Sequence, residues 1–186
     1  MSVRLVRSRT EDDLRLDGML HRPPADADRR DDWPADLVML VHGTAGNFYA
    51  SGILEHVAAA VVSSGTPALR INTRGHDGLT GDRGGAAFEN VDESRLDLAA
   101  WFSWARENGS QRVILVGHSM GGVKSIYAAA AAAVDPVAIV AISPPRFCHR
   151  LFQEHPAAGH FREDYARATE LVALGRGNEL LRVRQP

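Results

Sequence analysis

The sequence predicts an α/β fold: a mostly parallel sheet with an N-terminal antiparallel hairpin and helices on both faces. Three observations predict it. Two β-like segments separated by a polar turn open the chain, strand-like and helix-like segments then alternate, and the later strands are apolar on both sides. Since parallel neighbouring strands need a crossover connection, the alternation places a helix between successive strands.

The chain begins with the two strands of the expected hairpin. Residues 3–8 (VRLVRS) and 14–21 (LRLDGMLH) are short β-like runs on either side of the polar RTEDD. A charged, proline-rich loop follows over 23–36. The next run, LVMLVHG at 37–43, is continuously apolar, which is typical of a strand buried on both faces of a parallel sheet.

A helix and a further strand come next. In 52–65 (GILEHVAAAVVSSG) the apolar residues recur at helical spacing, and Gly65 stands where a C-terminal stop is expected. Residues 68–73 (ALRINT) predict a strand, and the glycine-rich 74–85 predicts a long loop.

The same unit then repeats. Residues 92–108 predict a helix, with Asp92 as its N-cap and Gly109 as its stop. A strand at 112–119 (RVILVGHS) precedes a helix at 120–134 (MGGVKSIYAAAAAAV).

The last predicted strand is VAIVAISPP, at 137–145, and residues 146–186 are polar and helix-prone. In this final segment one helix face carries the residues that we expect to pack, namely Phe161, Tyr165, Ala168 and Val172.

Composition favours one ordinary globular domain over 1–186. The chain has 186 residues, 45% hydrophobic and 24% charged, with a net charge of −2. So balanced a charge gives no reason to expect nucleic acid or a membrane as a partner, and favours a small-molecule ligand. A single cysteine, Cys148, and an N-terminus without an apolar segment predict a cytoplasmic protein. The longest apolar run, 127–134, is too short to span a bilayer.

The segment GHSMGG, at 117–122, predicts a nucleophilic serine. In G-x-S-x-G the serine occupies a very tight strand-to-helix turn, so the flanking Gly117 and Gly121 leave room for the backbone. The turn exposes the Ser119 hydroxyl and places it at a helix N-terminus, where free N–H groups favour a developing negative charge. The segment fits neither common phosphate-binding glycine pattern.

Four segments, in this order, resemble the α/β-hydrolase superfamily. They are TEDDLRLDGML, VMLVHGTAGN, LRINTRGHDG and RVILVGHSMGG, and the resemblance covers about residues 3 to 145. It is closest to the serine-hydrolase branch, which contains esterases, lipase-like enzymes and serine aminopeptidase-like proteins. The resemblance implies that Ser119 is the nucleophile and that the backbone N–H groups of Thr44 and Met120 form the oxyanion hole. Each such donor contributes roughly 3 to 4 kcal/mol to catalysis.

The resemblance therefore implies a serine hydrolase that acts on an ester, thioester or amide carbonyl, with a carboxylesterase as the leading reaction. Three alternatives stay open: a non-catalytic hydrolase-like binding protein, C–C bond hydrolysis, and acyl transfer to an acceptor other than water. We expect no cofactor and no metal site, since no metal-binding motif is present. The partner is expected to be a small-molecule acyl substrate.

The remaining polar residues have simpler expected roles. Histidines 42, 76 and 118 are expected to brace loops by hydrogen bonds. Asp77 and Asp82 are expected to be solvated in the glycine-rich loop. Phe48 and Tyr49 either line an acyl pocket or pack on the first helix.

The position of the catalytic acid and histidine is the open question of the sequence. In the family they follow the serine on later strands, whereas no convincing strand follows 137–145 here. We therefore expect an incomplete hydrolase domain that is inactive by itself, with 137–145 as an uncovered sheet edge. The alternative is that Glu154 or Asp164, together with His155 or His160, supplies the missing groups.

Overall fold

The structure is a computed structural model that describes residues 2–27, 33–50, 52–78, 84–146 and 148–181. The chain divides into two compact units, Met1–Pro145 and Arg146–Pro186. Within the described residues, the first unit holds the sheet and three helices, and the second holds two helices. The expected single domain over 1–186 stays a prediction.

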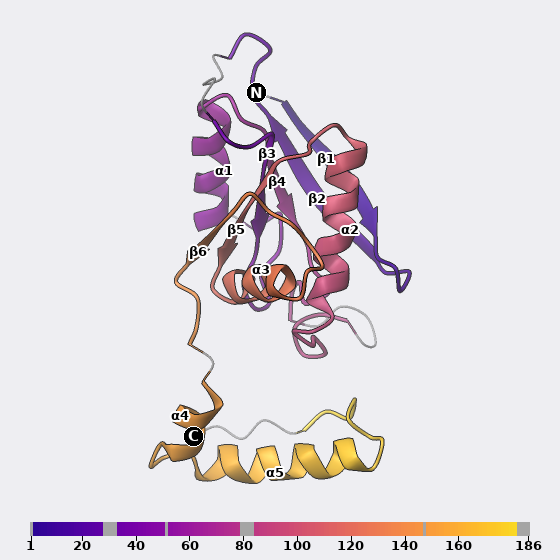
Figure 1. Cartoon of the computed structure of the whole chain (residues 1–186), viewed down its shortest axis with the longest axis vertical. Helices are drawn as coiled ribbons and strands as arrows, with labels where there is room; N and C mark the ends of the chain where they lie inside the picture. Colours follow the sequence, from indigo (N-terminus) through magenta and orange to yellow (C-terminus); the bar gives the residue numbers. More distant parts are fainter. Residues whose placement is uncertain (1, 28–32, 51, 79–83, 147, 182–186) are drawn as a thin grey trace. The chain divides into compact units, whose positions relative to one another are not determined.

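In the part of the first unit that the structure describes, one six-stranded sheet forms the centre, in the order β1-β2-β4-β3-β5-β6 (Figure 1). The strands β1 and β2 pair antiparallel, as do β2 and β4, and the other neighbours are parallel. This confirms the predicted mostly parallel sheet with an N-terminal hairpin. The strands are β1 (Ser2–Arg9), β2 (Arg15–Arg22), β3 (Leu37–Val41), β4 (Ala68–Ile71), β5 (Val113–His118) and β6 (Ala138–Ile142).

The register aligns the carboxyl ends of the four parallel strands. Val41 of β3 pairs with Ile71 of β4 and with Gly117 of β5, and Gly117 in turn pairs with Ala141 of β6. The loops that leave these strands therefore meet at one edge of the sheet, which is where ligands bind in open α/β sheets.

The helices that cover the two faces of the sheet are α1 (Ile53–Ser63), α2 (Ser94–Glu107) and α3 (Met120–Ala130). The helix α1 packs on one face and α2 and α3 on the other (Figure 1). On the first face Ala58 and Val62 pack against strand residues such as Val38. On the second, Leu98 and Trp101 pack against strand residues in a larger cluster. Both faces of β3, β4 and β5 are thus buried, as their continuous apolar runs predict.

Two helix ends differ from the expected ones. The helix α2 begins at Ser94, and Asp92 does not cap it, because its carboxylate accepts hydrogen bonds from Arg95 and Tyr127. A charged donor offers that carboxylate a stronger partner than a backbone N–H group does. The helix α3 ends at Ala130 instead of residue 134, since Ala132 has a φ of 55° and turns the chain towards β6.

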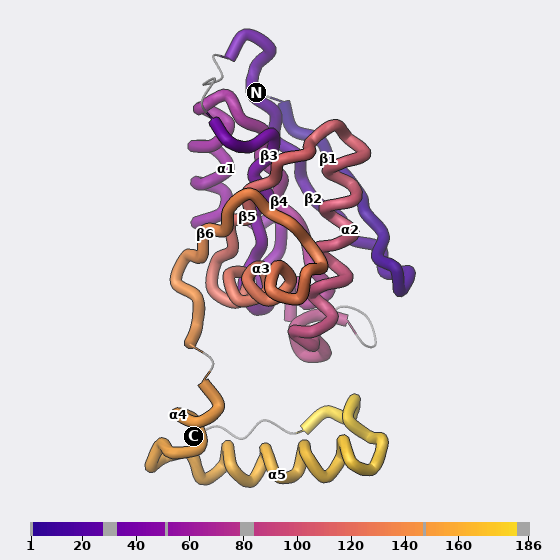
Figure 2. The backbone as a smooth tube through the Cα atoms, in the orientation of Figure 1, coloured from indigo at the N-terminus to yellow at the C-terminus, as the bar shows by residue number. Residues whose placement is uncertain are grey.

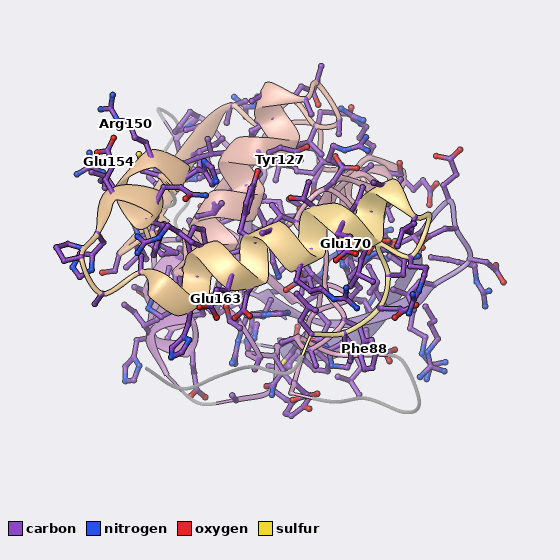
Figure 3. All side chains as sticks on the ribbon, turned by 90° about the horizontal axis from the view of Figure 1, so that it is seen from below. Phe88, Tyr127, Arg150, Glu154, Glu163 and Glu170 are labelled. Carbon is purple, nitrogen blue, oxygen red and sulfur yellow. The ribbon has the colours of Figure 1, made fainter. Side chains whose placement is uncertain are left out.

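The second unit contains α4 (His149–Glu154) and α5 (Gly159–Ala173). Arg150 and Glu154 of α4 are labelled in Figure 3. They lie one helical turn apart, with Arg150 Nε 3.9 Å from Glu154 Oε1. Four rings pack together in this unit, from His149, Phe152, Phe161 and Tyr165. The expected packing face of α5 is wrong at its end, where Leu171 is buried and Val172 is 65% exposed. A period of 3.6 residues accommodates either position, and the structure buries the leucine.

Among the described strands, β6 pairs only with β5 and forms one edge of the sheet. Its central Val140 and the preceding Val137 are each 48% exposed. An apolar, exposed edge strand is a template for pairing with another chain. No helix within the described ranges is long and apolar enough to cross a membrane.

We expect this edge to drive self-association of the 186-residue chain. Val140→Lys places a charge on the exposed position and should reduce association, measured by analytical ultracentrifugation over a concentration series, with an unchanged Tm. Ile53→Lys is the matched control, since Ile53 is 44% exposed but lies on α1, which packs against β2, β3 and β4. Equal association of V140K and the unaltered chain would show that β6 is not the cause.

Candidate active site

Ser119 lies in the turn between β5 and α3, at the carboxyl edge of the sheet. Figure 2 follows the backbone from β5 directly into α3. Ser119 has φ 53° and ψ −125°, a left-handed conformation that costs of order 1–3 kcal/mol for a residue other than glycine. Two hydrogen bonds hold it: its N–H donates to the carbonyl of Ile142 at 2.9 Å, and its carbonyl accepts from Gly122 at 3.0 Å.

Two glycines make the tight turn possible. A Cβ atom at Gly117 would lie 2.3 Å from the backbone carbon of Gly121. A Cβ atom at Gly121 would lie 2.2 Å from the carbonyl oxygen of Val41, on the neighbouring strand. Both contacts are with backbone, which has no rotamer to change, so neither position accommodates a side chain without moving α3 or the sheet.

The loop after β3 lies against the serine. A Cβ atom at Gly43 would be 2.9 Å from the Ser119 Cβ and 3.4 Å from its Oγ. Thr44 follows at an exposed position, and Met120 is the first residue of α3. None of the described residues accepts a hydrogen bond from the backbone N–H of Thr44 or Met120. The structure thus brings the Gly43–Thr44 loop next to Ser119, and leaves both amides without a protein acceptor in the described ranges.

His42 is a buried, neutral ring that holds this loop in place through a hydrogen bond to Gly43. The backbone N–H of Thr73 donates to His42 Nε2 at 3.1 Å, so Nε2 must carry a lone pair. The ring proton is then on Nδ1, which donates to the carbonyl of Gly43 at 2.7 Å. Burial and the nearby Lys124 ammonium lower the pKa of His42 from 6.5 to about 4, which keeps this tautomer at neutral pH. His42 thus has the bracing role expected from the sequence.

The sequence analysis missed a charged pair beneath the site. Lys124 of α3 is 0% exposed and forms an ion pair with Glu89, whose side chain is 6% exposed. The Lys124 Nζ also donates to Thr73 Oγ1 at 3.0 Å. One signal was present: Lys124 lies three residues after Gly121 and four before Ala128, so it shares the inward face of the helix.

Asp77 is not simply solvated, as the sequence analysis expected. Its carboxylate accepts hydrogen bonds from Asn47 at 2.7 Å, Tyr49 at 2.6 Å and His76 at 2.8 Å. These contacts tie the loop after β4 to the loop after β3. Tyr49 is therefore exposed and bonded to this loop instead of packing on α1. Asp82 lies outside the described residues.

Within the described part of the first unit, no imidazole nitrogen is hydrogen-bonded to the Ser119 hydroxyl. In the second unit, His155 Nδ1 accepts from the N–H of Ala157, and His160 lies 3.8 Å from Glu163. No group of three or more potential metal-binding side chains occurs in the portion of the chain that the structure covers.

The elbow geometry predicts a sharp difference between two glycines. Gly121→Ala should destabilise the fold by about 3 kcal/mol, because the new methyl group overlaps the Val41 carbonyl. Gly78→Ala is the matched control, since nothing lies within 4 Å of its Cβ position. Thermal unfolding tests this: Tm should fall by about 10 °C for G121A and stay nearly constant for G78A. An equal Tm for both variants would contradict the packing argument.

The buried His42 predicts a loss of stability in mild acid. Its lowered pKa means that the unfolded chain binds the extra proton first, so the free energy of unfolding falls as pH drops from 6.5 towards 4. The loss between pH 7 and 4.5 is about 2 to 3 kcal/mol, measured by urea unfolding. His42→Gln removes the titrating ring and should show a smaller fall. The lowered pKa of His21 adds a change of the same sign in both proteins. The same slope in H42Q would rule out His42 as the source.

Solved structures with a similar fold are esterases and other α/β hydrolases. An esterase from Pyrococcus furiosus has a TM-score of 0.63 at 22% identity, over 88% of this chain and 61% of its own. A lidless α/β serine hydrolase from Xanthomonas campestris has a TM-score of 0.57 at 21% identity, over 80% and 65%. A thermostable carboxyl esterase from Bacillus coagulans has a TM-score of 0.63 at 14% identity, over 95% and 52%.

The chain spans less than two thirds of the length of these structures. Among curated proteins, none matches the sequence significantly. A family model does match: residues 32–165 fit that of the serine aminopeptidases S33, and this range includes the Gly43 loop, the elbow and the Lys124–Glu89 pair. The chain therefore belongs to the serine aminopeptidase S33 family of α/β hydrolases.

Proposed function

We propose that the protein is a serine hydrolase with Ser119 as its nucleophile and a carboxylic ester as its preferred substrate. The observation that carries this proposal is the left-handed turn at Ser119, closed by Gly117 and Gly121 at the carboxyl edge of the sheet. Such strain is retained where the surrounding structure enforces it, and it lifts a hydroxyl away from the sheet towards a ligand.

In this proposal the Thr44 and Met120 amides bind the oxyanion. Ser119 Oγ attacks the substrate carbonyl carbon, and negative charge develops on the carbonyl oxygen. The proximity of Gly43 to Ser119, and the two amides that lack a protein acceptor in the described ranges, support this assignment. The N-terminal dipole of α3 favours the same charge. Collapse of the intermediate releases the alcohol, and water then hydrolyses the acyl-serine.

A general base must accept the Ser119 proton. His42 does not fit this role, because its Nε2 lone pair already accepts the Thr73 N–H and its Nδ1 proton is donated to Gly43. We propose that the base lies outside the first unit. His155 and His160, with Glu154 or Asp164, are the candidates within the 186 residues, and our preferred source is a histidine beyond them. On this view the 186-residue chain alone turns substrate over very slowly.

Esterase activity is favoured over the wider reactions of the family because two of the three fold neighbours named above are esterases, which supports the choice by likeness alone. A specific observation favours a second candidate, a non-catalytic hydrolase-like binding protein: no imidazole contacts the serine within the described first unit. The two candidates differ in whether Ser119 is chemically reactive.

A fluorophosphonate probe separates these candidates even when no base is present. Its phosphoryl oxygen needs the same oxyanion donors, so Ser119 should react about 100-fold faster than an ordinary exposed serine. Ser64, at the exposed end of α1, is the internal reference. Site occupancy over time, measured by peptide mass spectrometry, gives both rates in one sample. Ser119→Ala should remove the fast-reacting site, and unfolding in urea should abolish the difference.

Equal reaction rates of Ser119 and Ser64 in the folded chain would refute the assignment of Ser119 as the nucleophile. The non-catalytic binding protein would then be the remaining candidate. If Ser119 is selective, p-nitrophenyl esters of increasing acyl length test turnover. We expect His155→Gln and His160→Gln to leave the low rate unchanged. A large loss in either variant would place the base within the 186 residues.

A further inference from the structure

A buried charged pair underlies the loop next to Ser119. Lys124 is fully buried on α3, and its ammonium is paired with the Glu89 carboxylate. Burying two charges costs several kcal/mol per ion, and well-packed apolar residues often do as well for stability. Stability alone therefore does not explain why this ion pair is buried here. The hydrogen-bond partners of Lys124 indicate the role of the pair.

From Lys124 a chain of hydrogen bonds runs to the loop after β3. The Lys124 Nζ donates to Thr73 Oγ1 at 3.0 Å, and that oxygen lies 3.3 Å from His42 Nε2. The Thr73 N–H donates to the same Nε2, and His42 Nδ1 donates to the Gly43 carbonyl. Every donor in this chain points from α3 towards the Gly43 loop.

The direction of these hydrogen bonds depends on the positive charge of Lys124, where the series begins. An ammonium has donors only, so Lys124 occupies a lone pair of Thr73 Oγ1 and leaves the hydroxyl proton free to face His42. A neutral group that both donates and accepts would permit the reverse orientation.

The loop after β4 leaves room for the Glu89 carboxylate at Gly75. A Cβ atom at this position would lie 2.0 Å from the Glu89 carboxyl carbon.

We propose that Lys124 and Glu89 are positioning residues that, through Thr73 and His42, hold the Thr44 loop in place relative to α3. The two proposed oxyanion donors come from these two elements, Thr44 from the loop and Met120 from the start of α3. The pair fixes the distance between the donors, although neither residue touches substrate. This inference rests on the proposed function for its catalytic consequence, but not for the hydrogen-bond chain itself.

The principal test is the double variant Lys124→Met/Glu89→Gln. It removes both charges with side chains of similar size, so no buried ion is left unpaired, and we expect it to fold. The Ser119 phosphonylation rate should fall about 10- to 100-fold, since small displacements of catalytic groups have effects of this size. Nitrogen-15 NMR should show a shifted His42 Nε2 signal, because the Thr73 hydroxyl no longer faces that atom in one orientation, although the Thr73 N–H keeps the ring proton on Nδ1. The Thr44 amide signal should shift as well.

A second variant keeps the test independent of how well the double variant folds. Thr73→Val removes the hydroxyl with little change of shape and should slow Ser119 as the double variant does, whereas Thr73→Ser should restore most of the rate. Tyr127→Phe is the matched control, because it removes a hydrogen bond to Asp92 from the same helix without touching the chain to His42.

Two results separate the possible failures. If the His42 Nε2 signal, the Thr44 amide signal and the Ser119 rate are all unchanged in both the double variant and T73V, the pair serves packing only and the positioning role is wrong. If Ser119 is unreactive in the unaltered protein, the proposed function fails. The His42 and Thr44 NMR signals still decide the positioning role in that case, since they need no reaction.

Discussion

The close approach of α3 to β3 and β5 is the constraint on which the rest of the site depends. At Gly121 the helix meets the Val41 carbonyl with no room for a methyl group, and at Gly117 the strand meets the helix in the same way. This contact forces Ser119 into its left-handed turn and fixes its position above the sheet. It also sets the direction of α3, and through that direction the depth at which Lys124 is buried.

Polar groups then link the loops around this turn, so that the site does not depend on apolar packing alone. His42 joins the loop after β3 to the start of the loop after β4. Asp77 joins the same two loops from the solvent side. Arg74 ties the second loop to α2 through Asp97. Loops at a sheet edge have few apolar contacts, and hydrogen bonds to buried partners restrict their motion.

The two sheet edges have different chemical character. At the N-terminal side β1 carries several charged residues, among them Arg7 and Arg9, and charge of this kind discourages pairing with another chain. The edge strand β6 has no charged residue and exposes Val140. A strand of this composition is typical of a sheet interior, yet β6 lies at an edge. This agrees with the sequence analysis, which predicted an apolar strand at 137–145 and expected that strand to be an uncovered edge.

The sequence by itself determined the order and type of the elements, because apolar periodicity and glycine position act over a few residues. The all-apolar β3, the stop at Gly65 and the GHSMGG turn needed no tertiary information. Only the tertiary structure decided the partners of isolated polar residues, such as Asp92, Asp77 and Lys124. Their contacts join segments 28 to 51 residues apart. Helical spacing placed Lys124 on the inward face of α3, but the partners that Lys124 meets there, Glu89 and Thr73, come from distant segments, and that long-range pairing has no local signature in the chain.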